Sequence, residues 1–93
     1  MYYVYIMTNK NNTALYTGYT NNMWRRLNEH LSGHGAVFTY KYHVNKLVYF
    51  ESFELSKDAT AREKQIKAGS RKKKIDLINT LNPKWQDLAM QFK

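Results

Sequence analysis

Two tyrosines near the N-terminus are the first residues whose type and spacing could do chemistry. Tyr5 and Tyr16 are separated by ten residues, and both lie in Tyr-rich segments. Two phenols that meet beside a basic helix can orient or deprotonate a water molecule that attacks a phosphate. Tyrosine pairs between strands are also common structural devices, so a purely structural pair is the alternative interpretation.

A β-hairpin would bring these two tyrosines together. Residues 2–8 and 13–20 are rich in Tyr, Val, Ile and Thr, which favour strands, whereas the polar residues 9–12 favour a turn. If those four residues form the loop, Tyr5 lies directly opposite Tyr16. Opposed residues on one face of a sheet have Cβ atoms ~5 Å apart. The sequence therefore predicts two phenols in contact on one sheet face.

The hairpin is followed by a predicted short helix over residues 21–31, because an apolar residue recurs at every fourth position. The residues of this buried stripe are Met23, Leu27 and Leu31. The expected ends of the helix are an N-terminal cap at Thr20 or Asn21 and the terminating glycines Gly33 and Gly35.

Arg26 and His30 are also four residues apart and lie on a neighbouring face of this helix. The guanidinium of Arg26 could fork onto phosphate oxygens or stabilise charge that develops on a phosphate. His30 could hold a phosphate or a water molecule. The alternative interpretations are a surface arginine and a structural histidine.

The rest of the chain predicts one strand and three helices. Their expected positions are a strand at 47–53, a helix at 57–69 capped by Ser56, a helix from Ser70, and a helix starting at Asn82 and Pro83. This order indicates one α+β domain over residues 1–93. It contains a small, three-stranded, mostly antiparallel sheet with an N-terminal hairpin and flanking helices. Periodicity does not fix the partner of the third strand.

Glu63 is the most informative acidic residue. In the helix at 57–69 it shares the i, i+4, i+7 stripe with Ala59 and Ile66, which should face the core. A buried carboxylate is unfavourable unless it is paired or binds a metal. Mg²⁺ is typically held by one or two carboxylates, waters and phosphate oxygens. The alternative is an ion pair with Lys67, one turn further along the helix.

The 93 residues carry a net charge of +8, which suggests a polyanionic partner, either nucleic acid or an anionic membrane surface. Four consecutive cations occupy the first turn of the helix that starts at Ser70. There they oppose the helix dipole, while the free N–H groups attract phosphate. A solvated basic face is the alternative. The expected DNA-binding residues are Lys67, Arg71, Lys72, Lys73 and Lys74.

Composition excludes several other classes. The chain has no cysteine, which removes disulfides and thiolate metal sites. It has no long apolar run, and its N-terminus does not resemble a signal peptide, so we expect a cytoplasmic protein that does not span a membrane.

The complete set of motifs resembles the GIY-YIG nuclease domain. Residues 3–5 (Tyr-Val-Tyr) and 16–18 (Tyr-Thr-Gly) correspond to the two segments that name the family. Arg26 and His30 match the next motif, and Glu63 matches its single metal-binding acid. The resemblance covers most of the chain. It is closest to small stand-alone bacterial members, which are similar to the N-terminal domain of excinuclease C.

The chain departs from the family pattern at a few positions. Tyr3 replaces the first glycine, and Val4 and Thr17 replace the middle isoleucines. The family also tends to carry a late asparagine near the metal end of the site, for which Asn79 and Asn82 both compete.

The resemblance implies an endonuclease of DNA that depends on Mg²⁺ or Mn²⁺. It implies one metal ion on Glu63, a water activated by Tyr5 or Tyr16, and Arg26 on the transition-state charge. A free tyrosine has a pKa of ~10, so we expect nearby positive charge to lower it. A protein partner could supply specificity. The alternatives are a non-catalytic nucleic-acid-binding module and, more weakly, a membrane-surface protein.

Overall fold

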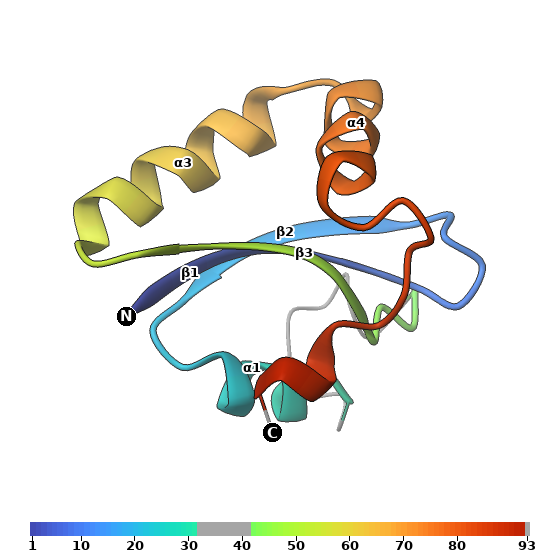
Figure 1. The fold of residues 1–93 in the computed structure, drawn as a ribbon, viewed down its shortest axis with the longest axis horizontal. Coiled ribbons are helices and arrows are strands. Elements are labelled where there is room, and N and C mark those ends of the chain that lie inside the picture. The colour runs from blue at the N-terminus through green and yellow to red at the C-terminus, as the bar shows by residue number, and fades with distance from the viewer. Residues whose placement is uncertain (32–41, 93) are drawn as a thin grey trace.

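The computed structural model describes residues 1–31 and 42–92, in which a three-stranded sheet separates two layers (Figure 1). Helices α3 and α4 cover one face of the sheet, and α1 and a C-terminal 3₁₀ helix, η1, lie against the other. This arrangement confirms the expected α+β fold. In chain order the elements are β1 (Tyr2–Thr8), β2 (Leu15–Thr20), α1 (Met23–Leu31), β3 (Lys46–Phe53), α3 (Ser56–Ala68), α4 (Arg71–Leu81) and η1 (Ala89–Phe92).

The central strand, β1, is buried on both faces. It pairs antiparallel with β2 on one side and with β3 on the other, which identifies the partner of the third strand. Val4 and Ile6 pack beneath α3 and α4, whereas Tyr5 and Met7 pack towards α1. Because successive side chains of a strand point to opposite faces, Tyr5 belongs to the α1 layer. In the described ranges, no helix is long and apolar enough to cross a membrane.

The predicted register, with Tyr5 directly opposite Tyr16, is wrong by two residues. Tyr5 pairs with Gly18, and Tyr16 pairs with Met7. A shift of two residues keeps every side chain on its own face, because the side-chain period of a strand is two. The two phenols therefore still share one face as diagonal neighbours.

The side chain of Asn9 explains this register. Its Oδ1 accepts hydrogen bonds from the backbone N–H groups of Thr13 and Ala14, at 2.8 and 3.1 Å. Asn12 adopts a left-handed conformation with φ of 58°, which asparagine tolerates better than most residues. The loop consequently contains residues 9–14 rather than the four expected.

Helix α1 packs its predicted stripe against the sheet, since Met23 and Leu27 are buried. Its N-terminal cap is Asn22, not Thr20 or Asn21, because the Asn22 Oδ1 accepts the N–H of Arg25 at 3.0 Å. Gly33, Gly35 and the side chain of Leu31, which also entered the prediction for this helix, lie outside the described part of the chain.

Helices α3 and α4 begin and end close to the predicted residues. Ser56 is the first residue of α3 rather than its cap, and its hydroxyl forms a 2.9 Å hydrogen bond with the Tyr19 hydroxyl. Gly69 ends α3, and its N–H donates to the carbonyl of Ile66 at 3.1 Å. Ser70 caps α4 as expected, because its Oγ accepts the N–H of Lys73 at 3.2 Å.

The helix predicted to start at Asn82 is absent from the described segment 83–88, and only η1 forms after it. Trp85 has a φ of 53°, which is incompatible with an α-helix. The buried amide of Asn82 instead donates to the carbonyls of Val48 and Gln86, at 3.1 and 2.8 Å. These bonds fasten the C-terminal segment to β3, so tertiary contacts override the helical signal.

Candidate active site

A glycine creates the space in which the first tyrosine lies. A Cβ added to Gly18 would be only 2.5 Å from Cζ of Tyr5 and closer still to its hydroxyl oxygen. The Tyr5 ring therefore crosses directly over the backbone of β2. Any side chain at residue 18 would displace the phenol. This steric conflict explains why the second motif has a glycine at this position.

Three rings meet on the α1 side of the hairpin. The ring centroids of Tyr5 and Tyr16 are 6.4 Å apart, and the ring of His30 is 6.1 Å from Tyr5 and 5.5 Å from Tyr16. The Tyr5 hydroxyl lies 3.3 Å from Nε2 of His30. Tyr5 and His30 are buried, whereas Tyr16 is half-buried and is the more accessible phenol.

Helix α1 supplies two buried nitrogen atoms to the same region. Arg26 and His30 lie one turn apart, and the helix is anchored by Met23 and Leu27 beneath them. Nε of Arg26 and Nδ1 of His30 are buried and have no hydrogen-bond partner within the described residues. Buried polar atoms are nearly always paired, so such atoms indicate a place where a ligand or water binds.

Burial sets the protonation of the first phenol. It raises the pKa of Tyr5 above its ordinary value, the neighbouring Tyr16 raises it further, and the charges of Glu63 and Glu29 act in the same direction. Arg26 opposes the shift without reversing it. The expected lowering of the Tyr5 pKa by positive charge is therefore not found, and Tyr5 stays protonated near neutral pH.

Burial also decides the state of the histidine. It lowers the pKa of His30, and the positive charge of Arg26 lowers it further, while Glu29 partly opposes both. His30 is thus neutral near pH 7. Its Nε2 can accept the proton of the Tyr5 hydroxyl, which leaves Nδ1 as the N–H donor.

Glu63 lies on α3, which covers the sheet face opposite α1. It lies on the buried stripe with Ala59 and Ile66, as predicted, and only 19% of its side chain is exposed. The predicted alternative pair also exists, because Nζ of Lys67 is 3.1 Å from a Glu63 oxygen. The charge of Glu63 nevertheless contributes to raising the pKa of Tyr5.

The donor set fits a weakly held divalent cation. Glu63 offers one mostly buried carboxylate, and the described residues contain no group of three or more His, Cys, Asp or Glu that could hold a metal. Mg²⁺ commonly keeps several waters and takes further oxygen ligands from substrate phosphates. A single, mostly buried carboxylate is compatible with that mode of binding.

One charged residue near the site was missed by sequence reasoning. Glu29 acts on both Tyr5 and His30 through its charge, and it also forms an ion pair with Arg25 at 3.6 Å. It follows Arg26 by three residues. That spacing on a helix was the available signal that the two side chains lie on adjacent faces.

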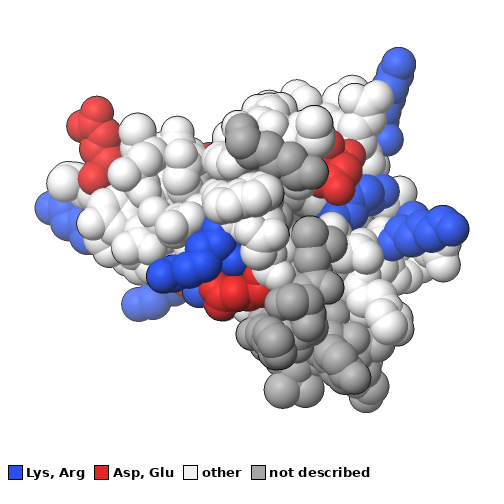
Figure 2. Space-filling view, turned by 90° about the horizontal axis from the view of Figure 1, so that it is seen from below, with Lys and Arg blue, Asp and Glu red and all other residues white. Residues whose placement is uncertain are grey.

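The predicted DNA-binding residues are only partly available for an external anion. The Arg71 guanidinium donates to the carbonyl of Thr13 at 2.8 Å, and Lys72 pairs with Asp76 at 3.0 Å. Viewed from the α1 side, acidic and uncharged side chains lie among the Lys and Arg side chains on the part of this face that is not drawn in grey (Figure 2). The basic first turn of α4 belongs to the opposite layer (Figure 1).

The two late asparagines both have structural partners. The Asn82 amide is fully engaged between β3 and the C-terminal segment, and the Asn79 Oδ1 accepts the indole N–H of Trp85 at 2.7 Å. These contacts explain both residues as parts of the scaffold.

The family follows from the match between sequence and fold. Residues 1–76 match the GIY-YIG catalytic domain. The chain belongs to the GIY-YIG family. The predicted site residues Tyr5, Tyr16, Arg26, His30 and Glu63 all lie inside the matched range. The GIY-YIG catalytic domain is a nuclease domain that acts on nucleic acid, so the general class expected from the motifs is confirmed.

Several UPF0213 proteins are similar to this chain over most of its length. A UPF0213 protein of Clostridium perfringens is 44% identical over 92 residues, which cover 99% of this chain and 98% of that protein. A UPF0213 protein of Staphylococcus haemolyticus is 43% identical over 77 residues, covering 83% and 93%. The solution NMR structure of a UPF0213 protein from Bacillus halodurans has a TM-score of 0.60 at 34% identity, covering 94% of this chain and 93% of that one.

Proposed function

We propose that the protein is a metal-dependent endonuclease that hydrolyses phosphodiester bonds in DNA. The observation that carries this proposal is the convergence of Tyr5, Tyr16 and His30 with the charges of Arg26 and Glu63. A nucleic-acid-binding module without activity would need the basic surface but would have no use for a mostly buried Glu63.

The two phenols differ in burial, and we assign them different roles for this reason. Tyr5 stays protonated and donates to Nε2 of His30, which holds the imidazole and the second phenol in place. Tyr16 is half-buried, and it is the general base that takes a proton from the attacking water. The water oxygen then forms a bond to phosphorus while the bond to the leaving oxygen breaks, and solvent supplies the proton that this oxygen takes.

Arg26 and a cation held by Glu63 would both stabilise the negative charge of the phosphate. The guanidinium of Arg26, with its unpaired Nε, donates hydrogen bonds to the phosphate oxygens as charge develops on them. Glu63 would hold one Mg²⁺ or Mn²⁺, which when bound polarises the phosphate and stabilises the leaving oxygen. When bound to Glu63, the cation would replace the ion pair between Glu63 and Lys67.

The first test is a cleavage assay with supercoiled, linear, branched and single-stranded DNA, in Mg²⁺, in Mn²⁺ and in chelator. We expect cutting that requires the metal and is abolished by Glu63→Ala. Lys67→Ala breaks the same ion pair but keeps the carboxylate, so it should weaken DNA binding and still permit cutting at saturating DNA. Absence of cutting on every substrate, with DNA binding retained by all three proteins, would refute the proposal and favour the binding module.

A further inference from the structure

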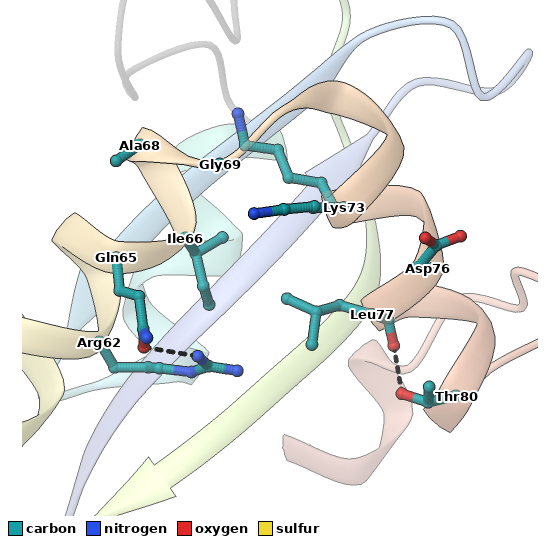
Figure 3. Close-up of a pocket in the computed structure, with 10 residues that line it drawn as sticks. Arg62, Gln65, Ile66, Ala68, Gly69, Lys73, Asp76, Leu77 and Thr80 are labelled. Atoms are coloured by element: carbon teal, nitrogen blue, oxygen red, sulfur yellow. Dashed lines mark hydrogen bonds between the residues drawn. The ribbon is translucent and has the colours of Figure 1, made fainter.

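A cleft lies between α3 and α4, on the sheet face opposite α1 (Figure 3). Its volume is about 530 Å³ and one side is open to solvent. This volume falls within the range of about 300–1,000 Å³ that is typical of pockets for small ligands. The cleft is separate from the tyrosine cluster, because it lies over Val4 and Ile6 rather than over Tyr5.

The floor of the cleft is apolar. Ile66 of α3 and Leu77 of α4 point towards one another across the gap between the helices (Figure 3). Ile66 is buried and Leu77 is partly buried, so both are held in position by the core. A flat apolar group such as a nucleobase can pack against side chains of this kind.

The cations of the cleft differ from the other cations of the basic run. Lys73 and Lys74 line it, and within the described residues neither side chain forms an ion pair. By contrast, Lys67 pairs with Glu63, and Lys72 pairs with Asp76. Two unpaired ammonium groups beside an apolar floor favour a ligand that carries both an anionic and an apolar part.

The remaining cation of the cleft is already committed to the protein. Nε of Arg62 donates to both oxygens of Glu51, at 3.1 and 3.0 Å, and its Nη1 donates to Oε1 of Gln65 at 2.6 Å. Glu51 in turn accepts a hydrogen bond from the Tyr49 hydroxyl. Arg62 is therefore a fixed part of the wall. Because the Gln65 Oε1 already accepts from Arg62, the amide NH₂ is the part of the Gln65 side chain that can donate to a polar ligand edge.

We infer that this cleft binds one unpaired nucleotide of a nucleic acid strand. The base packs against Ile66 and Leu77, and the phosphate is held by Lys73 and Lys74. A paired base inside a duplex is stacked and cannot enter a cleft, so the site selects a nucleotide that is bulged, terminal or single-stranded. The inference rests on the proposed function only in taking nucleic acid as the ligand, and it assigns a substrate class to the protein.

The test measures binding without cleavage. Fluorescence anisotropy in chelator compares a labelled DNA duplex that has one bulged nucleotide with the same duplex fully paired. We expect the packing of one base against Ile66 and Leu77 to make binding of the bulged duplex roughly tenfold tighter. The double variant Lys73→Ala with Lys74→Ala should abolish this preference.

The matched control is Lys57→Ala with Lys64→Ala. Both lysines are exposed on α3 and lie outside the cleft, and the net charge falls equally in the two double variants. The control should weaken binding to both duplexes and keep the preference. Equal loss of preference in the two variants, or no preference in the unmodified protein, would overturn the inference.

Two further measurements locate the ligand and separate the two proposals. In ¹⁵N NMR titrations, a deoxynucleoside 5′-monophosphate should shift the amide signals of Ile66, Gly69 and Leu77 more than inorganic phosphate does. Equal shifts would show a phosphate site without a base pocket and would refute the inference. A protein that cuts DNA but shows no preference refutes only this inference, and a preference without cutting refutes only the endonuclease proposal.

Discussion

The ring of Tyr5 occupies the space in which a side chain at Gly18 would begin. A Cβ at that position would lie 2.5 Å from Cζ of Tyr5, far inside contact distance. The two residues are cross-strand partners in the β1–β2 ladder. The glycine of the second motif and the tyrosine of the first are therefore one structural unit, because a side chain at residue 18 would displace the Tyr5 ring.

Gly18→Ala should both destabilise the protein and disturb the site. Forcing a methyl group against the buried Tyr5 ring costs about 1–3 kcal/mol of unfolding free energy, and the displaced phenol should lose its contact with His30. Urea denaturation and the cleavage assay measure these effects. Gly69→Ala is the control, because its Cβ would come no closer to another atom than 3.3 Å, the distance to the Ile66 carbonyl oxygen. Similar losses in the two variants would contradict the steric explanation.

Tyr16→Phe should lower kcat by about 10²–10⁴-fold and change KM little. Tyr16 is the phenol that remains half-exposed, and the proposal assigns it the proton of the attacking water. Steady-state cleavage kinetics of the wild type and of the variant measure this loss. Tyr5→Phe should lower kcat less, because that phenol is buried and stays protonated. If Tyr5→Phe lowered kcat more than Tyr16→Phe does, Tyr5 would be the residue that takes the proton of the attacking water.

Acid should destabilise the fold through His30. Folding lowers the pKa of this residue through burial and the charge of Arg26. Between that lowered pKa and ~6.5, its value in the unfolded chain, the unfolded state binds more protons. The stability that neutral His30 provides is therefore complete above pH ~6.5 and is lost as the pH falls through the lowered pKa.

Urea denaturation at pH 7.5 and 5.5 measures this effect, and His30→Gln should reduce the difference between the two pH values. His43→Asn is the control, since His43 is exposed and its φ of 53° is tolerated by asparagine. An undiminished pH effect in His30→Gln would show that other groups cause the acid sensitivity.

Asn82→Ala should lower the unfolding free energy by about 1–3 kcal/mol. The substitution leaves the buried carbonyl of Val48 without its partner and removes the bonds to Gln86. Cleavage by the protein that remains folded should be preserved, because the amide is engaged in the scaffold. Asn79→Ala, which removes only an exposed bond to Trp85, should have a smaller effect on stability. Full stability with lost cleavage in Asn82→Ala would instead place this residue in the site.

Local patterns in the sequence predicted the elements that carry the site. Strand-forming residues placed β1 and β2, and the four-residue spacing placed Arg26 beside His30 on α1. The core-facing position of Glu63 followed in the same way from the stripe it shares with Ala59 and Ile66. These features depend on residues within a turn or two of one another, and that is the range over which periodicity carries information.

The tertiary structure decided what depends on residues that are distant in the chain or on single side-chain contacts. The Asn9 side chain lengthened the hairpin loop and moved Tyr5 opposite Gly18, and residue types alone did not reveal that contact. Contacts between Asn82 and β3 replaced a predicted helix with an extended segment. The pKa of Tyr5 is raised rather than lowered as expected, because burial outweighs the charge of Arg26. This burial exists only once α1 and the sheet have packed together.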